Sequence, residues 1–183
     1  MAKAKHIITC KLFSCNSLPE INLYDNIIAA SLKGRFDKIF KGLFGFGKGE
    51  IKLSLSGVYS EDTYIGAENI IKYDVRLRRR KVGYVTIRIG ESPQLFYLGH
   101  IGYRINEPFR GNGYAAKAVE LLIPIIRRLG YKSMVITTDE DNIPSRKTCE
   151  KLGCVLEQIV KVPNMFLDLC MGSKTKCRYI LII

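Results

Sequence analysis

The chain has 183 residues, which is room for one ordinary domain but not for two full ones. Hydrophobic residues make up 47% and charged residues 25%, a balance typical of a folded globular protein and not of a disordered chain. Lysine and arginine number 29 against 17 aspartates and glutamates, so the formal net charge is +12. That excess points to an anionic partner without choosing among nucleic acid, an acidic substrate and a cofactor.

The cysteines, the histidines and the amino terminus bear on metal binding and location. No C-x-x-C pair is present, and His6 and His100 alone cannot complete a zinc site of two cysteines and two histidines, so we expect no metal. Only Ile7 and Ile8 follow the basic first residues, so we expect no signal peptide, and no run reaches the roughly 18 apolar residues of a membrane span. We expect a cytoplasmic protein with reduced thiols at all six cysteines, which are Cys10, Cys15, Cys149, Cys154, Cys170 and Cys177.

The predicted elements alternate between strands and helices. Residues 6–14 are expected to form a strand and 20–40 one or two helices, followed by a glycine-rich loop at 42–49. Residues 50–68 show no clear pattern. Further strands are predicted at 71–77, 82–89, 96–105, 133–138, 155–162 and 176–183, and helices at 113–129 and 142–152. This order predicts one domain, residues 1–183, with a mixed α/β sheet flanked by helices.

The densest chemical signal is the segment from Tyr103 to Lys117. A strand ends near Ile105, and glycines lead directly into a helix, whose first amides and dipole favour a phosphate group. Gly111 and Gly113 permit positive φ and a close approach of ligand to backbone, and Arg110 adds a positive charge. The segment therefore indicates a phosphate-binding turn, although a plain strand-to-helix turn would use glycines in the same way.

A dinucleotide site is one interpretation of this turn. The run from Gly111 to Ala116 fits G-x-G-x-x-G/A, and Asp139 follows the next strand, where a ribose ligand would be expected. However, five residues separate the strand from the first glycine, and the strand alternates instead of being continuously apolar. Both features disfavour this interpretation.

Two motifs together resemble another family. Arg110-Gly-Asn-Gly113-Tyr-Ala115 is similar to the acetyl-CoA-binding signature Q/R-x-x-G-x-G/A of the GNAT-type N-acetyltransferases. The run from Asn142 to Gly153 resembles the N-x-x-S-x-x-x-x-E-K-x-G helix of the same superfamily. The similarity covers about residues 97–160 and is closest in motif to the ribosomal-protein-alanine acetyltransferase branch.

The resemblance implies a GNAT-like fold with a splayed central sheet and acetyl-CoA as cosubstrate. The strands around Gly99–Ile105 and Ser133–Thr138 would part to admit pantetheine, and a bulge near the strand glycines would free an amide to polarise the thioester carbonyl. The resemblance assigns the pyrophosphate to the loop, the pantetheine to the preceding strand and the cofactor arm to the following helix. These residues are, in that order, Arg110, Gly111, Asn112, Gly113, Tyr114 and Ala115; Ile101, Tyr103 and Ile105; Asn142 and Ser145.

The reaction that the resemblance implies is direct transfer of an acetyl group to a primary amine, without a covalent enzyme intermediate. A carboxylate would take the proton of the amine, and the candidates are Glu107, Glu157 and Asp74. Many relatives carry a tyrosine seven residues after the motif asparagine, where this chain has Cys149. Ser145, Cys149 or a water molecule is left as the acid for the departing thiolate.

Two further segments are candidates for partner binding. The run at 42–49 spells a P-loop-like G-x-x-x-x-G-K but lacks the hydroxyl residue for magnesium, so we interpret it as a lid over the acceptor site or an ordinary loop. Residues 69–90 hold seven basic residues and one acidic residue, most of them on a predicted hairpin within 72–88. That hairpin could contact RNA or the ribosome, and a GNAT-like binding module without catalysis is the alternative function. The acceptor amine could belong to a protein amino terminus or a small molecule; we expect no membrane partner and a monomer or homodimer.

Overall fold

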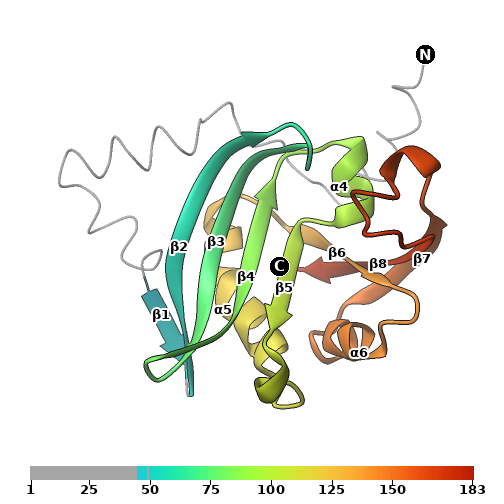
Figure 1. Ribbon diagram of the computed structural model, residues 1–183. Helices are drawn as coiled ribbons and strands as arrows, with labels where there is room; N and C mark the ends of the chain where they lie inside the picture. The colour runs from blue at the N-terminus through green and yellow to red at the C-terminus, as the bar shows by residue number, and fades with distance from the viewer. Residues whose placement is uncertain (1–44, 49) are drawn as a thin grey trace.

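The computed structural model describes residues 45–48 and 50–183 (Figure 1). The strand predicted at 6–14, the helices predicted at 20–40, and Cys10, Cys15 and His6 lie outside the described residues. The described elements, in chain order, are β1 (Gly45–Lys48), β2 (Ile51–Asp62), β3 (Ala67–Leu77), β4 (Arg80–Ile89), α4 (Pro93–Leu98), β5 (Ile101–Ile105), a 3₁₀ turn (Glu107–Phe109), α5 (Tyr114–Arg128), β6 (Ser133–Asp139), α6 (Ile143–Lys151), β7 (Val155–Lys161), a second 3₁₀ turn (Asn164–Phe166) and β8 (Thr175–Ile182).

Two antiparallel sheets carry the fold, which confirms the predicted mixed α/β class. The larger sheet has the order β1-β2-β3-β4-β5 and the smaller one β6-β8-β7. In the larger sheet, period-two alternation sends residues such as Tyr73 and Val75 into the core, where both are fully buried. Residues 50–68, which the sequence left open, form β2 and the start of β3, with a register shift between Leu55 and Gly57.

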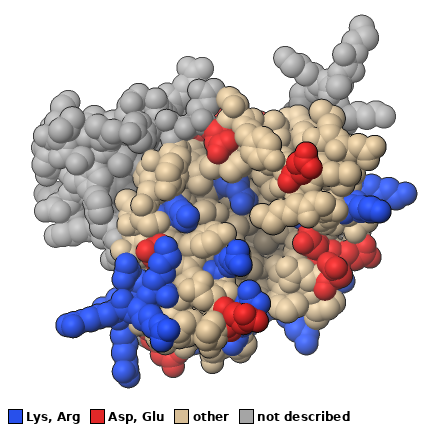
Figure 2. Space-filling model, viewed as in Figure 1, with Lys and Arg blue, Asp and Glu red and all other residues tan. Residues whose placement is uncertain are grey.

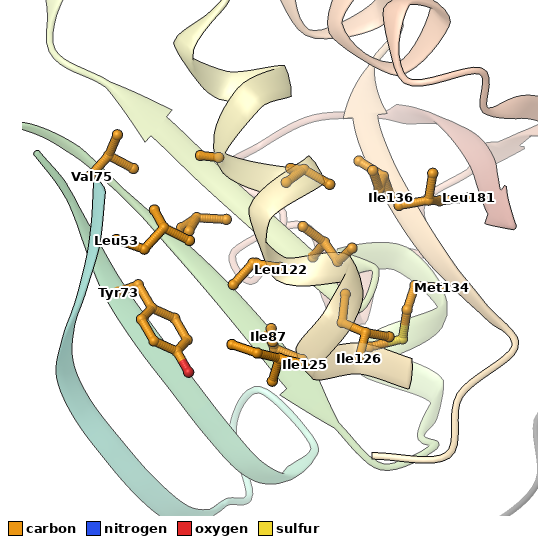
Figure 3. Close-up of a cluster of buried hydrophobic side chains, with 14 of the residues drawn as sticks. Leu53, Tyr73, Val75, Ile87, Leu122, Ile125, Ile126, Met134, Ile136 and Leu181 are labelled. Carbon is orange, nitrogen blue, oxygen red and sulfur yellow. The ribbon is translucent and has the colours of Figure 1, made fainter. Parts of the chain in front are cut away.

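Helix α5 joins the two sheets through one hydrophobic core. Figure 3 shows Leu122, Ile125 and Ile126 of this helix between side chains of both sheets. Leu53, Tyr73 and Ile87 come from the larger sheet and Met134, Ile136 and Leu181 from the smaller one. The predicted helix at 113–129 and its apolar face are therefore confirmed, and Pro124 lies inside it at an exposed position.

The strand predicted at 96–105 is wrong in its first half. Ser92 caps a short helix by accepting a hydrogen bond from the Leu95 amide, Pro93 begins it, and Gly99 ends it with a φ of 70°. Strand β5 starts only at Ile101, and its register with β4 runs unbroken from Ile87↔Ile101 to Gly83↔Ile105. The bulge expected in this strand is therefore absent from its pairing with β4.

The glycine-rich segment is also corrected where the structure describes it. Residues 45–48 form strand β1, paired with β2 from Gly45↔Ser54 to Lys48↔Ile51, instead of a loop. Pairing with β2 makes these four residues the edge strand of the larger sheet. Residues 42–44 and Gly49 lie outside the described part.

The two sheets meet at one point and separate beyond it. Gly99 forms a single bridge with Ile136, and the His100 amide donates to the Val135 carbonyl at 2.7 Å. An added Cβ at Gly99 would lie 2.8 Å from the Thr137 amide nitrogen, so only glycine permits this approach. Past this junction β5 and β6 belong to different sheets, and Figure 1 shows them diverging. The splayed arrangement that the resemblance implied is present.

Candidate active site

The loop between β5 and α5 has the backbone of an anion-binding turn. Gly111 and Gly113 adopt φ values of 81° and 70°, and Gly113 caps α5 without any side-chain hydrogen bond. The first amides of the helix therefore have neither an intrahelical acceptor nor a capping side chain. An added Cβ at Gly111 would meet nothing within 4 Å, so the loop is open on its outer side. The predicted location of the phosphate-type turn agrees with this geometry.

Side-chain hydrogen bonds hold the loop in this shape. Arg110 Nε donates to the Ile105 carbonyl at 3.1 Å, which ties the loop to the end of β5. Asn112 Nδ2 donates to the carbonyls of Phe109 and Arg110, each at 3.2 Å. The side chains predicted to contact a phosphate thus also brace the backbone that would do so.

Lys151 belongs to the motif at 142–153, but the motif alone assigns no role to its side chain. Its Nζ atom lies 2.8 Å from the position of a Cβ built on Gly113, so the ammonium group stands directly at the amino end of α5. The exposed Lys151 is the last residue of α6 and reaches the loop from that helix. Two cations, Arg110 and Lys151, therefore flank the open amides.

Tyr103 crosses the gap between β5 and α6. Its hydroxyl group lies 3.0 Å from Ser145 Oγ and 3.8 Å from Cys149 Sγ, and it donates to the Ser145 carbonyl at 3.3 Å. Burial raises the pKa of Tyr103 well above its ordinary value, so the phenol stays protonated at neutral pH. The sequence assigned Tyr103 only to the pantetheine-binding strand, and the structure places its phenol 3.8 Å from Cys149 Sγ.

Asn142 and Cys149 are the other predicted residues on α6 and its cap. Asn142 accepts a hydrogen bond from the Ser145 amide through its side-chain oxygen, at 3.2 Å, and so caps the helix. Cys149 is completely buried, and hydrogen bonds from Cys154 and then Tyr103 lower its pKa despite that burial. Ser145 is half-buried and faces Tyr103, whereas the buried Cys149 lies farther from the Tyr103 hydroxyl group than Ser145 Oγ does.

The structure does not gather the predicted carboxylates at this cluster. Glu157 pairs with Arg178 at 2.8 Å, and Asp74 pairs with Lys81 at 2.6 Å. Glu107 is exposed on the 3₁₀ turn before the glycine loop. Within residues 45–48 and 50–183, none of the three is hydrogen-bonded to Tyr103 or Ser145.

The basic hairpin projects from the turn between β3 and β4, where Figure 2 shows a cluster of lysines and arginines. Several of its charges are already engaged. Asp74 pairs with Lys81 and with Arg76, the latter at 3.6 Å, and the Arg80 guanidinium lies 4.9 Å from the centre of the Phe109 ring. Arg78 lies in the turn itself with a φ of 54°. A contact of this hairpin with RNA or the ribosome stays a prediction.

The family follows from a direct match. The profile of the acetyltransferase (GNAT) domain matches residues 57–155, more than half of the chain, so the chain belongs to this family. The two motifs had predicted this membership, and it is confirmed. No curated protein matches the chain.

Solved structures share the fold at low sequence identity. A GNAT family acetyltransferase from Elizabethkingia anophelis with acetyl-CoA bound is 14% identical over 74% of this chain and 100% of its own, with a TM-score of 0.56. The microcin C7 self-immunity acetyltransferase MccE, in complex with acetyl-CoA and AMP, is 23% identical with a TM-score of 0.48, and this chain spans 61% of its length. RimL, a ribosomal L7/L12 alpha-N-protein acetyltransferase, is 23% identical over 62% of this chain and 70% of its own, with a TM-score of 0.49.

The described residues contain neither a metal-binding cluster nor a membrane-spanning helix. No group of three or more histidine, cysteine, aspartate or glutamate side chains there is arranged to hold a metal ion. In the same part of the chain, no helix has the length and apolar character needed to cross a membrane.

Proposed function

We propose that this protein is an acetyl-CoA-dependent N-acetyltransferase that moves an acetyl group to a primary amine by direct attack. One observation carries the proposal: an open glycine loop at the amino end of α5, with the Lys151 ammonium beside Gly113, follows strand β5, whose Tyr103 hydroxyl group contacts Ser145 of α6. Membership of the GNAT family and the acetyl-CoA bound to the structurally similar Elizabethkingia protein support it.

The chain's own residues would hold the cosubstrate in three places. The amides from Arg110 to Ala115 would receive the diphosphate, with the charges of Arg110 and Lys151 beside them. The backbone of Ile101, Tyr103 and Ile105 would pair with the amide-bearing pantetheine arm, as an added strand does. Asn142, whose oxygen caps α6, would offer its amide group to the same arm.

The hydroxyl pair of Tyr103 and Ser145 would protonate the departing thiolate. When the amine nitrogen bonds to the acetyl carbon, the carbon–sulfur bond breaks and the sulfur needs a proton or a hydrogen-bond donor. The burial that raises the pKa of Tyr103 keeps its proton available, and Ser145 Oγ at 3.0 Å can relay it. Cys149 then serves as a buried hydrogen-bond partner of Tyr103 and not as the proton donor.

None of the predicted carboxylates is well placed to act as the base that takes the proton of the amine. Glu157 pairs with Arg178 and Asp74 pairs with Lys81, and neither carboxylate is hydrogen-bonded to Tyr103 or Ser145. Glu107 makes no ion pair with any described residue, but it sits on the exposed turn before the phosphate loop. Among these three carboxylates, none both lies beside Tyr103 and Ser145 and is free of an ion pair.

Calorimetry tests the cosubstrate, and a tyrosine substitution tests the acid. Saturable binding of acetyl-CoA is expected, and its absence at hundreds of micromolar would overturn the proposal. Tyr103→Phe should leave acetyl-CoA binding within about twofold but lower kcat by about 10- to 100-fold, as loss of one positioned donor does. Release of CoA would be followed with a thiol reagent, using spermidine, lysine and short peptides as acceptors.

The matched control is Tyr97→Phe, because Tyr97 packs against Phe96 and Phe166 through its ring and lies on α4 instead of at the cleft. That variant should keep full activity. An equal loss of kcat in both variants, or none in Tyr103→Phe, would contradict the assignment of Tyr103.

A further inference from the structure

A cavity of about 620 Å³ lies on the face of the larger sheet that turns away from α5. In Figure 1 α5 runs behind this sheet, so Figure 2 views the cavity's side of the molecule. Its walls include three tyrosines, Tyr59, Tyr64 and Tyr84, and two cations, Lys72 and Arg88. It is open to solvent, and Tyr59 and Tyr64 are each more than half exposed.

This cavity adjoins the strand that we propose to hold pantetheine. An added Cβ at Gly102, in the middle of β5, would lie 2.8 Å from Arg88 Nη2 and 2.9 Å from Thr86 Oγ1. Thr86 Oγ1 also donates to the Gly102 carbonyl at 3.2 Å. The side chains at the inner end of the cavity therefore touch β5 itself.

The guanidinium of Arg88 is fixed at that inner end. Its Nη1 atom donates to the carbonyls of Leu98 and Gly99, at 3.1 and 3.0 Å. The Nη2 edge faces Gly102 and the cavity. Arg88 makes no ion pair with any residue from 45–48 or 50–183, and burial lowers its pKa, as expected for a cation without a carboxylate beside it.

The remaining charges of the cavity also leave it positive. The Lys72 ammonium stands 4.8 Å from the centre of the Tyr84 ring and has no ion pair within the described residues. The one acidic side chain among the lining residues that the structure describes, Asp62, accepts a hydrogen bond from the Ile65 amide at 2.9 Å in the β2–β3 turn. Two cations therefore face the cavity against one carboxylate that is engaged by the backbone.

We infer that this cavity binds the acceptor and selects amines that carry a carboxylate close to the reacting nitrogen. This inference rests on the proposed acetyltransferase function. A carboxylate bound to the Nη2 edge of Arg88 would neutralise the unpaired guanidinium, and the planar group suits such an anion better than an ammonium does. Because Arg88 touches Gly102, the carboxylate would hold the adjacent amine beside β5, where its nitrogen can attack the thioester carbon.

The same chemistry has two sources, a free α-amino acid and a peptide whose first residue is acidic. One arm of the experiment compares L-phenylalanine with L-phenylalaninamide, and the other compares a peptide that begins with Asp-Ala with one that begins with Asn-Ala. In at least one arm, kcat/KM should be about 10- to 100-fold higher for the carboxylate member. The arm that shows the preference identifies the source, and equal values in both arms would overturn the inference.

Substitution of Arg88 links the preference to this side chain. Arg88→Met should remove the preference while the Kd of acetyl-CoA stays within about twofold, and Arg88→Lys should retain part of it because the charge remains. Arg79→Met is the matched control, since Arg79 is an exposed arginine of the β3–β4 turn outside the cavity lining. A preference that survives Arg88→Met, or that Arg79→Met removes equally, would refute the role of Arg88.

A binding measurement separates this inference from the proposed function. N-acetyl-L-phenylalanine should bind the wild-type protein more tightly than its amide does in a titration followed by NMR, and Arg88→Met should remove that difference. The titration needs no turnover, so failure of acetyl-CoA to bind would overturn the enzyme proposal alone. Normal acetyl-CoA binding with no difference between the two probes would overturn the carboxylate site alone.

Discussion

Lys151→Met gives the sharpest test of the cosubstrate loop. The Lys151 ammonium stands 2.8 Å from where a Cβ on Gly113 would be, and an anion seated on the first amides of α5 would lie within contact distance of it. Two unit charges about 4 Å apart attract by about 1 kcal/mol in water and by about 4 kcal/mol at the effective dielectric constant of a protein surface. Lys151 is exposed, so the lower part of that range applies, and the loss should be about 1 to 2 kcal/mol.

This energy corresponds to a weakening of CoA binding by roughly 5- to 30-fold. Titration calorimetry of CoA against the wild-type and variant proteins measures it directly. The loss should shrink at high salt, because screening weakens an exposed charge pair. Pantetheine, which lacks the diphosphate, should bind both proteins equally well.

The control variant is Lys147→Met, one turn earlier on α6 and exposed to solvent. It removes the same charge from the same helix without approaching Gly113, so it should change the Kd of CoA by less than about twofold. Equal losses of CoA affinity in the two variants would show that the effect comes only from the change in net charge. A loss that pantetheine shares with CoA would show that the substitution distorts the cleft, and either result would refute the phosphate contact of Lys151.

Two predictions concern stability and are measured by urea unfolding. Gly99→Ala should lower the free energy of unfolding by about 3 kcal/mol or more, because it combines a φ of 70° and a ψ of 168° with a Cβ only 2.8 Å from the Thr137 amide nitrogen. Gly111→Ala, with a φ of 81° and no neighbour within 4 Å, should lower it by about 1 kcal/mol. Equal losses in the two variants would refute the argument that Gly99 is needed where the sheets meet. For Asp139, burial alone would raise its pKa, but the hydrogen bond and charge of Lys176 hold it below the ordinary value. A depressed pKa gives stability that is present above the unfolded-state value of about 3.9 and is lost as the pH falls through the folded value, so Asp139→Asn should cost about 1 kcal/mol at pH 6 to 7 and nothing at strongly acidic pH. A cost that stays constant from pH 7 into that acidic range would contradict this linkage.

Local signals explain which elements the sequence could predict. Helix α5 has a long apolar stripe, a glycine at its start and basic residues in its last turn, and apolar and polar residues alternate over 71–77 in β3 and 85–89 in β4. Helix α4 has only six residues, too few for a helical period to stand out from an apparent strand. Its signal lies in the ends instead, because Ser92 and Pro93 begin a helix and Gly99 ends one.

The candidate site likewise has parts that the sequence could predict and parts that it could not. The glycine loop and the cap at Asn142 are local in sequence, so their motifs could predict their positions. The side-chain contacts are tertiary: Tyr103 meets Ser145 across 42 residues, and Lys151 meets Gly113 only because α6 packs beside α5. Composition and periodicity carry no information about such pairings. The available hint for Lys151 was its place in the E-K-x-G motif, and for Tyr103 its alternation with the buried Ile101 and Ile105.

Two arginines, Arg88 and Arg110, are tied to the backbone at or near the two ends of β5. At the carboxyl end Arg110 is tied to the Ile105 carbonyl, and just before the amino end Arg88 is tied to the carbonyls of Leu98 and Gly99. Arg88 Nη2 reaches Gly102, and about 10 Å of strand separates Gly102 from Ile105, so the two guanidinium groups mark sites too far apart for one small anion. The proposed chemistry requires this separation, because the diphosphate and the carboxylate of the acceptor would repel each other at close range. The arm that joins the diphosphate to the thioester would lie along β5 between them, past Tyr103, whose hydroxyl group lies beside Ser145 of α6.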